Sequence, residues 1–218
     1  FHELPCPGIV HVSMMFRMTD RSLDELADIA LASSMYGELP TDEHDADELQ
    51  TEIKLKTGRM NFNLDVISVK DHPSSCIPVL TASFSVLENG VEDACRLALE
   101  ILTSTDFTLR DKIREMVMQE DYYSKTSIES AGHSVACTRA CAHTNAPSAV
   151  SDAISGVYGY RKLHGFAEHF DERFDSFAAT ARSIRSSLCS ERMILSVTAP
   201  HPVDLSSLIH AFPAGTPV

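Results

Sequence analysis

The order of strand-like and helix-like segments is the feature that most limits how this chain can fold. β-prone or alternating apolar residues predict strands at 9–17, 60–69, 79–87 and 193–197. Apolar residues at helical spacing fill the intervals, in the order strand, two helices, two strands, four helices, strand, helix. Regular strand–helix alternation is missing, which disfavours a doubly wound sheet. The order predicts an α+β domain with a layer of helices on a mixed sheet.

Two helices are expected between the first two strands. Ser22 and Glu25 match a capping box, and the helix that they begin extends toward Gly37. Thr41 is expected to begin the second helix, and Gly58 suits the C′ position at its end.

Acidic residues crowd the start of this second helix: Asp42, Glu43, Asp45 and Asp47. Such a cluster can bind a cation, or it can complement the positive end of the helix dipole. The dipole explains the cluster without a ligand, and it is the interpretation that we favour from sequence.

Four further helices are expected before the last strand. They run from residue 91 to 101, from Thr108 over about 35 residues until Asn145-Ala146-Pro147, from a cap at Ser148 to Phe166, and from 171 to 188. A final helix is expected at 204–210, and residues 213–217 have the composition of a terminus or linker.

Charge and apolar content disfavour two classes of partner. Thirty-one acidic residues against 18 basic ones give a formal net charge of −13, without a basic cluster. Nucleic acid is therefore not an expected partner, because phosphate binding needs clustered Lys and Arg. No apolar run reaches the roughly 20 residues that span a bilayer, so no membrane partner is expected.

Residues 1–5 lack the features of a signal peptide, and we expect a fragment boundary there.

Cysteine usage predicts the compartment. Six cysteines are scattered without a C-x-x-C pair: Cys6, Cys76, Cys95, Cys137, Cys141 and Cys189. This spacing in a chain of 218 residues favours buried free thiols over a disulfide scaffold. The expected location is cytoplasmic, with an organelle matrix as the alternative.

One stretch approaches a zinc-peptidase motif without matching it. His164, Glu168 and His169 give the spacing H-x-x-x-E-H, whereas inverted zinc peptidases use H-x-x-E-H on a helix. The two histidines are five positions apart, so on a regular helix they point in directions roughly 140° apart around the axis. They therefore cannot share one metal ion from a regular helix.

A second group combines His133, Cys137, Cys141 and His143. Imidazole and thiolate suit zinc, but a structural zinc site usually takes ligands from two elements. Because free cysteine is often buried, we expect core packing here.

Neither the aromatic residues nor a search for catalytic and nucleotide-binding motifs identifies a functional site. Tyr122, Tyr123, Tyr158 and Tyr160 are expected to be core or groove aromatics, with peptide binding as a further option. No nucleophile elbow, P-loop or dinucleotide fingerprint occurs. The sequence assigns no catalytic, cofactor-binding or metal-ligating residue to this segment.

Four ordered stretches resemble the presequence-protease branch of the insulinase/pitrilysin zinc peptidases. They are Gly8-Ile9-Val10-His11-Val12 running to Phe16; Tyr36-Gly37-Glu38-Leu39-Pro40-Thr41 with Asp47-Glu48-Leu49, Ile53 and Thr57-Gly58; Ser127-Ile128-Glu129-Ser130-Ala131-Gly132-His133-Ser134 with Ala136 and Arg139-Ala140; and Ile154-Ser155-Gly156-Val157 with Tyr160 and Leu163. The set spans nearly the whole chain, and its order makes it more specific than any one stretch.

The resemblance implies a multidomain zinc enzyme whose two halves enclose a peptide chamber. Residues 1–218 would be one non-catalytic domain, the third of four, with 199–218 as a C-terminal helix and linker toward the next. The implied fold is a two-layer sandwich of helices on a mixed, mainly antiparallel sheet. Zinc would lie in the parent's first domain and no cofactor in this segment, and the partners would be the other parent domains and peptide substrates.

The implied function is a wall of the chamber in an endopeptidase that degrades short unstructured peptides, with no cleavage by this segment alone. Two alternatives stay open. The parent is an inactive scaffold or assembly subunit of the same fold, or the chain is a small metal-binding protein that uses His133, Cys137 and Cys141.

Overall fold

A computed structural model describes residues 2–3 and 8–214 of the chain. Five described strands form one sheet in the order β1-β5-β2-β4-β3. Their bounds are β1 His2–Glu3, β2 Ile9–Arg17, β3 Arg59–Ser68, β4 Cys76–Leu87 and β5 Met193–Ala199. β1 is parallel to β5, and the other neighbouring pairs are antiparallel. The expected mixed, mainly antiparallel sheet is confirmed.

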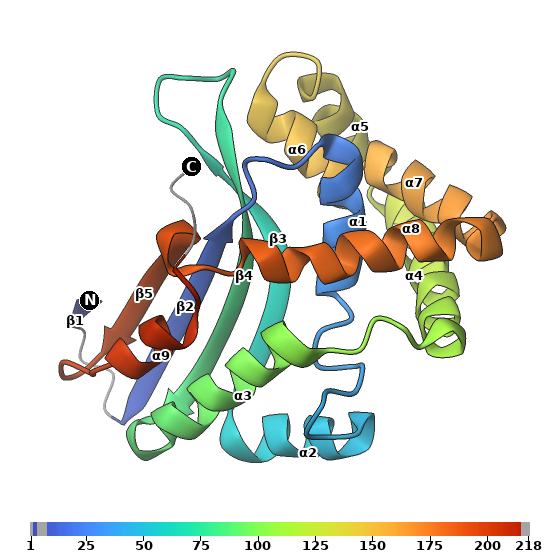
Figure 1. Cartoon of the computed structure of the whole chain (residues 1–218). Helices are drawn as coiled ribbons and strands as arrows, with labels where there is room; N and C mark the ends of the chain where they lie inside the picture. The colour runs from blue at the N-terminus through green and yellow to red at the C-terminus, as the bar shows by residue number, and fades with distance from the viewer. Residues whose placement is uncertain (1, 4–7, 215–218) are drawn as a thin grey trace.

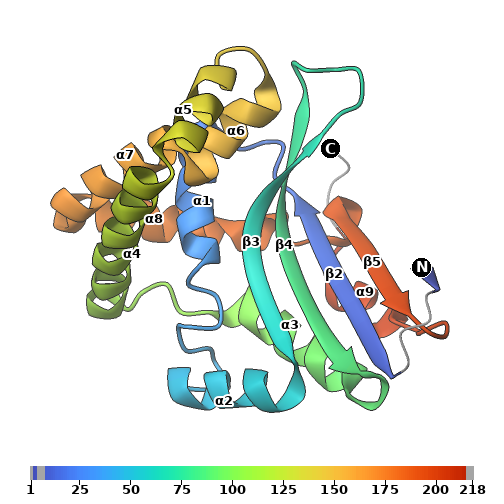
Figure 2. The same ribbon diagram turned by 180° about the vertical axis from the view of Figure 1, so that it is seen from behind.

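Helices cover one face of this sheet. They are α1 Leu23–Ser33, α2 Ala46–Lys56, α3 Val91–Ser104, α4 Arg110–Ser130, α5 Gly132–Cys141, α6 Ala146–Ser155, α7 Val157–Glu168, α8 Phe170–Ser183 and α9 Ser206–Ala211. α3, α8 and α9 lie across the sheet, and α1 with α4–α7 form a second group beyond β3 (Figure 1). Seen from behind, the other face carries none of the described helices (Figure 2). No described helix has the length and apolarity to cross a membrane.

The covered face of the sheet and the helices above it share one core. Every second residue of β2 is buried: Val10, Val12, Met14 and Phe16. This alternation is the period of two that a half-buried strand requires. The helical side of the core comes mainly from α3 and α8: Ala94, Leu97, Ala98, Ile101, Phe174, Phe177, Ala178 and Ala181. The α+β sandwich inferred from sequence is confirmed.

Helix starts follow the capping residues. The predicted capping box of Ser22 at the start of α1 is confirmed. The prediction that Thr41 begins the second helix is wrong, because Asp45 makes a capping box with Glu48 and α2 begins after it. Gly58 follows the C-cap Thr57 as expected, but its φ is not positive, and its backbone N–H donates to the Ser85 carbonyl of β4 at 3.0 Å.

The prediction of one helix over about 35 residues from Thr108 is also wrong. Ala131, at φ −113° and ψ 29°, separates α4 from α5. Asn145 accepts a hydrogen bond from the backbone N–H of Ser148 and caps α6, so Ser148 is not the cap. Gly156 then separates α6 from α7. One-residue breaks leave the apolar spacing almost unchanged, which is why periodicity does not detect them.

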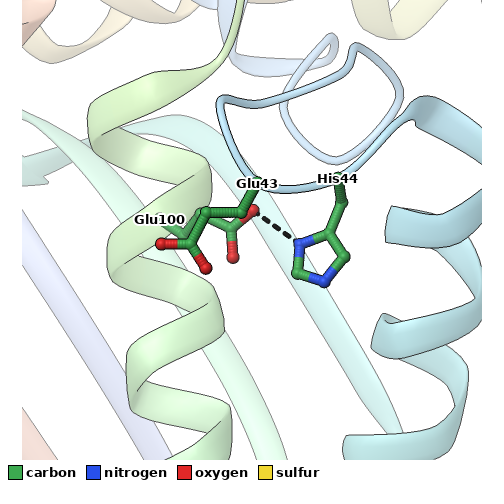
Figure 3. Close-up of side chains that lie close together, drawn as sticks. All are labelled: Glu43, His44 and Glu100. Atoms are coloured by element: carbon green, nitrogen blue, oxygen red, sulfur yellow. Dashed lines mark hydrogen bonds and ion pairs between the residues drawn. The ribbon is translucent and has the colours of Figure 1, made fainter.

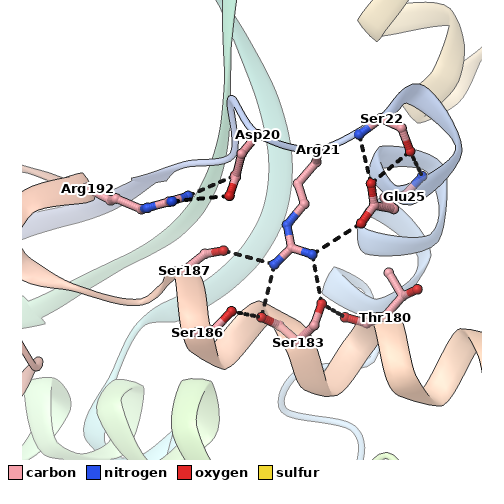
Figure 4. Close-up of polar contacts among 9 residues, drawn as sticks. All are labelled: Asp20, Arg21, Ser22, Glu25, Thr180, Ser183, Ser186, Ser187 and Arg192. Carbon is pink, nitrogen blue, oxygen red and sulfur yellow. Dashed lines mark hydrogen bonds and ion pairs between the residues drawn. The ribbon is translucent and has the colours of Figure 1, made fainter. Parts of the chain in front are cut away.

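Arg21 ties the start of α1 to the end of α8 (Figure 4). Its guanidinium donates to the Glu25 carboxylate at 3.3 Å and to the Ser187 hydroxyl at 3.1 Å. It also donates to the hydroxyl and the backbone carbonyl of Ser183, at 2.9 and 3.1 Å. The Arg21 side chain is only 11% exposed, so these bonds lie where the local dielectric is low. They fix α8 across the sheet.

Replacing Arg21 with Ala is expected to lower the free energy of unfolding by about 2–4 kcal/mol, because the polar groups that it satisfies lose their partner. Urea unfolding followed by circular dichroism measures this loss. Arg96→Ala is the matched control, since that side chain is 67% exposed and pairs with Asp93 within one helix. We expect the control to change stability by less than about 0.5 kcal/mol. Equal losses in the two variants would contradict the role of Arg21.

A second prediction concerns acid stability. Arg192 donates to both carboxylate oxygens of Asp20, at 2.8 and 3.1 Å, and this lowers the pKa of Asp20. Ionised Asp20 therefore stabilises the fold above its unfolded pKa, and that contribution is lost as the pH falls through its folded pKa. Between about pH 5 and pH 3, the urea midpoint of the unsubstituted chain should fall further than that of Arg192→Gln. Identical pH profiles would show that the pair does not contribute.

Candidate functional site

Among the residues that the structure describes, one group of three side chains brings possible metal ligands together: Glu43, His44 and Glu100. Glu43 and His44 lie in the connection that precedes α2, and Glu100 lies in α3 (Figure 3). One possible ligand atom of each lies within 4.8 Å of the others. His44 Nδ1 is 2.8 Å from Glu100 Oε1, and the Thr41 hydroxyl donates to the same oxygen.

Burial of Glu100 explains its two polar contacts. Its side chain is 7% exposed, where a carboxylate without partners would be costly. The hydrogen bond that His44 donates to the Glu100 carboxylate raises the pKa of His44, which favours the imidazolium. This pair links the α1–α2 connection to α3.

The helix-dipole interpretation of the acidic group holds for only part of it. Asp45 caps α2 and Asp47 lies in its first turn, where negative charge is favourable. Asp42 and Glu43 precede the helix, so the dipole does not account for them. The Glu43 carboxylate instead lies beside that of Glu100 (Figure 3).

The two histidines of the near-motif lie on different elements. His164 is inside α7, whereas His169 is the junction residue between α7 and α8. His164 Nδ1 lies 3.1 Å from Asp121 of α4, and its Nε2 lies 3.5 Å from Glu168. Within the described residues, His164 and His169 belong to no shared group of three ligands.

The Cys/His stripe lies on α5, a helix without a buried residue. Cys137 and Cys141 are exposed, so the expectation that they pack in the core is wrong. In the described part of the chain, they form no group of three ligands with His133. The remaining cysteines differ in burial: Cys95 and Cys189 are buried, Cys76 is half-buried, and Cys6 lies outside the described residues.

The tyrosines have three different settings. A cleft of about 310 Å³ between α1, α4, α6 and α7 is lined by Tyr123 and Tyr160, which confirms the groove interpretation for both. Tyr122 is 67% exposed on α4, so it is not a core residue. Tyr158 donates a hydrogen bond to Asp24 of α1.

One row of side chains across the uncovered face of the sheet is polar and uncharged. One row across four strands runs through directly paired residues: Asn61, Ser83, Ser13 and Ser196. In the next row, His11 Nδ1 lies 2.8 Å from the Ser85 hydroxyl. Hydrogen-bonding groups therefore form part of a face that no described helix covers (Figure 2).

The corner between α5, α6 and α7 explains part of the sequence resemblance. Asp152 is 1% exposed and accepts a hydrogen bond from Arg139 at 2.7 Å. A Cβ at Gly156 would lie 2.3 Å from Asp152 Oδ1, so only glycine fits there. Arg139 and Gly156 therefore hold a helix corner. Sequence reasoning missed this pairing, because Asp152 lies outside the four stretches that carry the resemblance.

Comparison with solved structures identifies the fold. A conserved protein from Enterococcus faecalis aligns with a TM-score of 0.67 and 10% identity, over 98% of this chain and 50% of that one. A peptidase M16 inactive domain from Pseudomonas fluorescens aligns with a TM-score of 0.59 and 13% identity, over 100% of this chain and 49% of that one. The fold is thus that of the M16 peptidase domains.

Sequence comparison gives the family. The model of the associated domain of peptidase family M16, subfamily C, matches residues 1–165, and the chain belongs to that family. The mitochondrial presequence protease of Yarrowia lipolytica is 28% identical over 149 residues, which cover 66% of this chain and 15% of that protein. The Drosophila melanogaster presequence protease is 24% identical over 132 residues, which cover 60% of this chain and 13% of that protein. The resemblance inferred from the four stretches is confirmed, and the chain spans only a small part of these relatives.

Replacing Gly156 with Ala should lower the free energy of unfolding by about 1–3 kcal/mol, because the added methyl group meets Asp152. Gly132→Ala is the control, since nothing lies within 4 Å of a Cβ there. In the first turn of α5 it should leave stability unchanged or raise it by up to about 1 kcal/mol. Denaturant unfolding compares the two, and a harmless Gly156→Ala would contradict the close packing.

Proposed function

We propose that this chain is a non-catalytic domain of a zinc-dependent endopeptidase that degrades short unstructured peptides. One observation carries the proposal. This chain belongs to the associated-domain family, and the regions that match it make up only 15% and 13% of the two presequence proteases described above. A segment of that size acts together with the rest of a much longer chain. Zinc belongs to the first domain of that parent, and no cofactor or catalytic residue is assigned to this segment.

The uncovered sheet face supports a place in the wall of the peptide chamber. Its central row offers hydroxyl and amide groups from Ser13, Asn61, Ser83 and Ser196 without charge. Such groups can exchange hydrogen bonds with the backbone of an unfolded peptide, whatever its side chains. A chamber that accepts varied sequences needs a surface of this kind.

In this proposal residues 1–218 are the third of four domains, and 199–218, which include α9, lead toward the next. The partners are the other domains of the same parent and peptide substrates, with no role for nucleic acid or membrane. The mitochondrial names of the relatives favour the organelle matrix over the cytoplasm.

An inactive scaffold of the same fold is the second candidate. The similarity to the Pseudomonas fluorescens structure, which is named as an M16 inactive domain, favours it. The parent's first domain discriminates the two, because an intact H-x-x-E-H supports an enzyme and degenerate ligands support a scaffold. The third candidate, a Cys/His metal-binding protein, is disfavoured. Cys137 and Cys141 of α5 are exposed, and in the described part of the chain they form no group of three ligands with His133.

A cleavage assay with a fluorogenic peptide tests the proposal. It compares the full-length protein, expressed from the complete reading frame, with residues 1–218 alone. The full-length protein should cleave the peptide with zinc present and lose activity with a chelator. Residues 1–218 alone should show no cleavage with added zinc. Zinc-dependent cleavage by the isolated segment would reject the proposal, and inactivity of the full-length protein would favour the scaffold.

A further inference from the structure

We propose that Glu43, His44 and Glu100 form a site for a divalent metal ion of the zinc class. The three side chains come from two elements that are far apart in sequence, the α1–α2 connection and α3. That is the arrangement by which a bound ion would link separate parts of a fold.

The distances suit a shared ion. Possible ligand atoms of the three residues lie within 4.8 Å of one another. Two ligands of one zinc ion, each about 2.0–2.2 Å from it, are about 3–4 Å apart. His44 Nδ1 and Glu100 Oε1, now 2.8 Å apart, would need to separate only slightly.

The state of Glu100 is a second, independent indication. Its side chain is more than nine-tenths buried, since only 7% of it is exposed. Both of its side-chain hydrogen bonds use Oε1, one from Thr41 and one with His44. Oε2 takes part in neither bond, so it is the oxygen that an ion can reach.

The placement of Glu43 points the same way. Its carboxylate makes no hydrogen bond or ion pair with the described residues, yet it lies beside that of Glu100 in a chain of net charge −13 (Figure 3). Like charges this close repel each other unless a cation lies between them. A single imidazolium can balance one of these two carboxylates, and a divalent ion can balance both.

The donor set selects the type of ion. One imidazole with two carboxylates fits zinc, whereas magnesium and calcium prefer oxygen ligands alone. As the ion binds, His44 releases its proton to solvent and the imidazole nitrogen donates its lone pair to the metal. Thr41 continues to donate to Glu100 and orients the carboxylate.

The experiment is a zinc titration by isothermal calorimetry in a background with Cys137→Ser and Cys141→Ser, because both thiols are exposed and bind zinc themselves. Single variants Glu43→Gln, His44→Gln and Glu100→Gln are compared with Asp42→Asn. The control removes one exposed negative charge from the residue adjacent to Glu43 and outside the cluster. Circular dichroism checks that each variant is folded.

We expect one zinc ion per chain, and at least tenfold weaker binding in each of the three cluster variants but not in Asp42→Asn. If Glu100→Gln fails to fold, exposed Glu43 still tests the site. Absence of zinc binding in the Cys-substituted background, or equal affinities of Glu43→Gln and Asp42→Asn, would overturn the proposal. Those results would leave His44 and Glu100 as an ion pair only. Peptidase activity is not a readout, so the outcome is separate from that of the proposed function.

Discussion

The apolar face of the five-stranded sheet must be covered, and most of the structure follows from that need. α3 and α8 cross this face and share one core with the alternate residues of β2. Arg21 then holds the end of α8 against the start of α1 through bonds in a largely buried setting. Because all of this covering lies on one side, the other face of the sheet is left open, with Ser13, Ser83 and Ser196 along its centre. The feature used for the proposed function is thus a result of how the core is built.

Features set by neighbours in sequence were predictable. The strand at 9–17 matches β2, and Ser22 with Glu25 caps α1 as expected, because both signals depend on a few adjacent residues. The helix breaks at Ala131 and Gly156 were not predictable, since neither break disturbs the spacing of apolar residues. The start of α2 was misplaced for a related reason: several acidic residues compete as caps, and local backbone geometry decides between them.

The ligand cluster could not be found from sequence. His44 and Glu100 are 56 residues apart, and only the packing of α3 beside the α1–α2 connection brings them together. The single available signal was the excess of acidic residues before the cap of α2, which the helix dipole explains only in part. The exposure of Cys137 and Cys141 was equally hidden, because a thiol carries no sequence mark of its burial.

We propose that this domain supplies a surface, and that its open sheet face lies against the peptide in the parent protein. A structure of the full-length protein with a bound peptide tests this most directly. We expect Ser13, Ser83 and Ser196 to face the enclosed space that holds the peptide. A structure in which this face packs against another domain, or lies in bulk solvent outside the chamber, would contradict the claim.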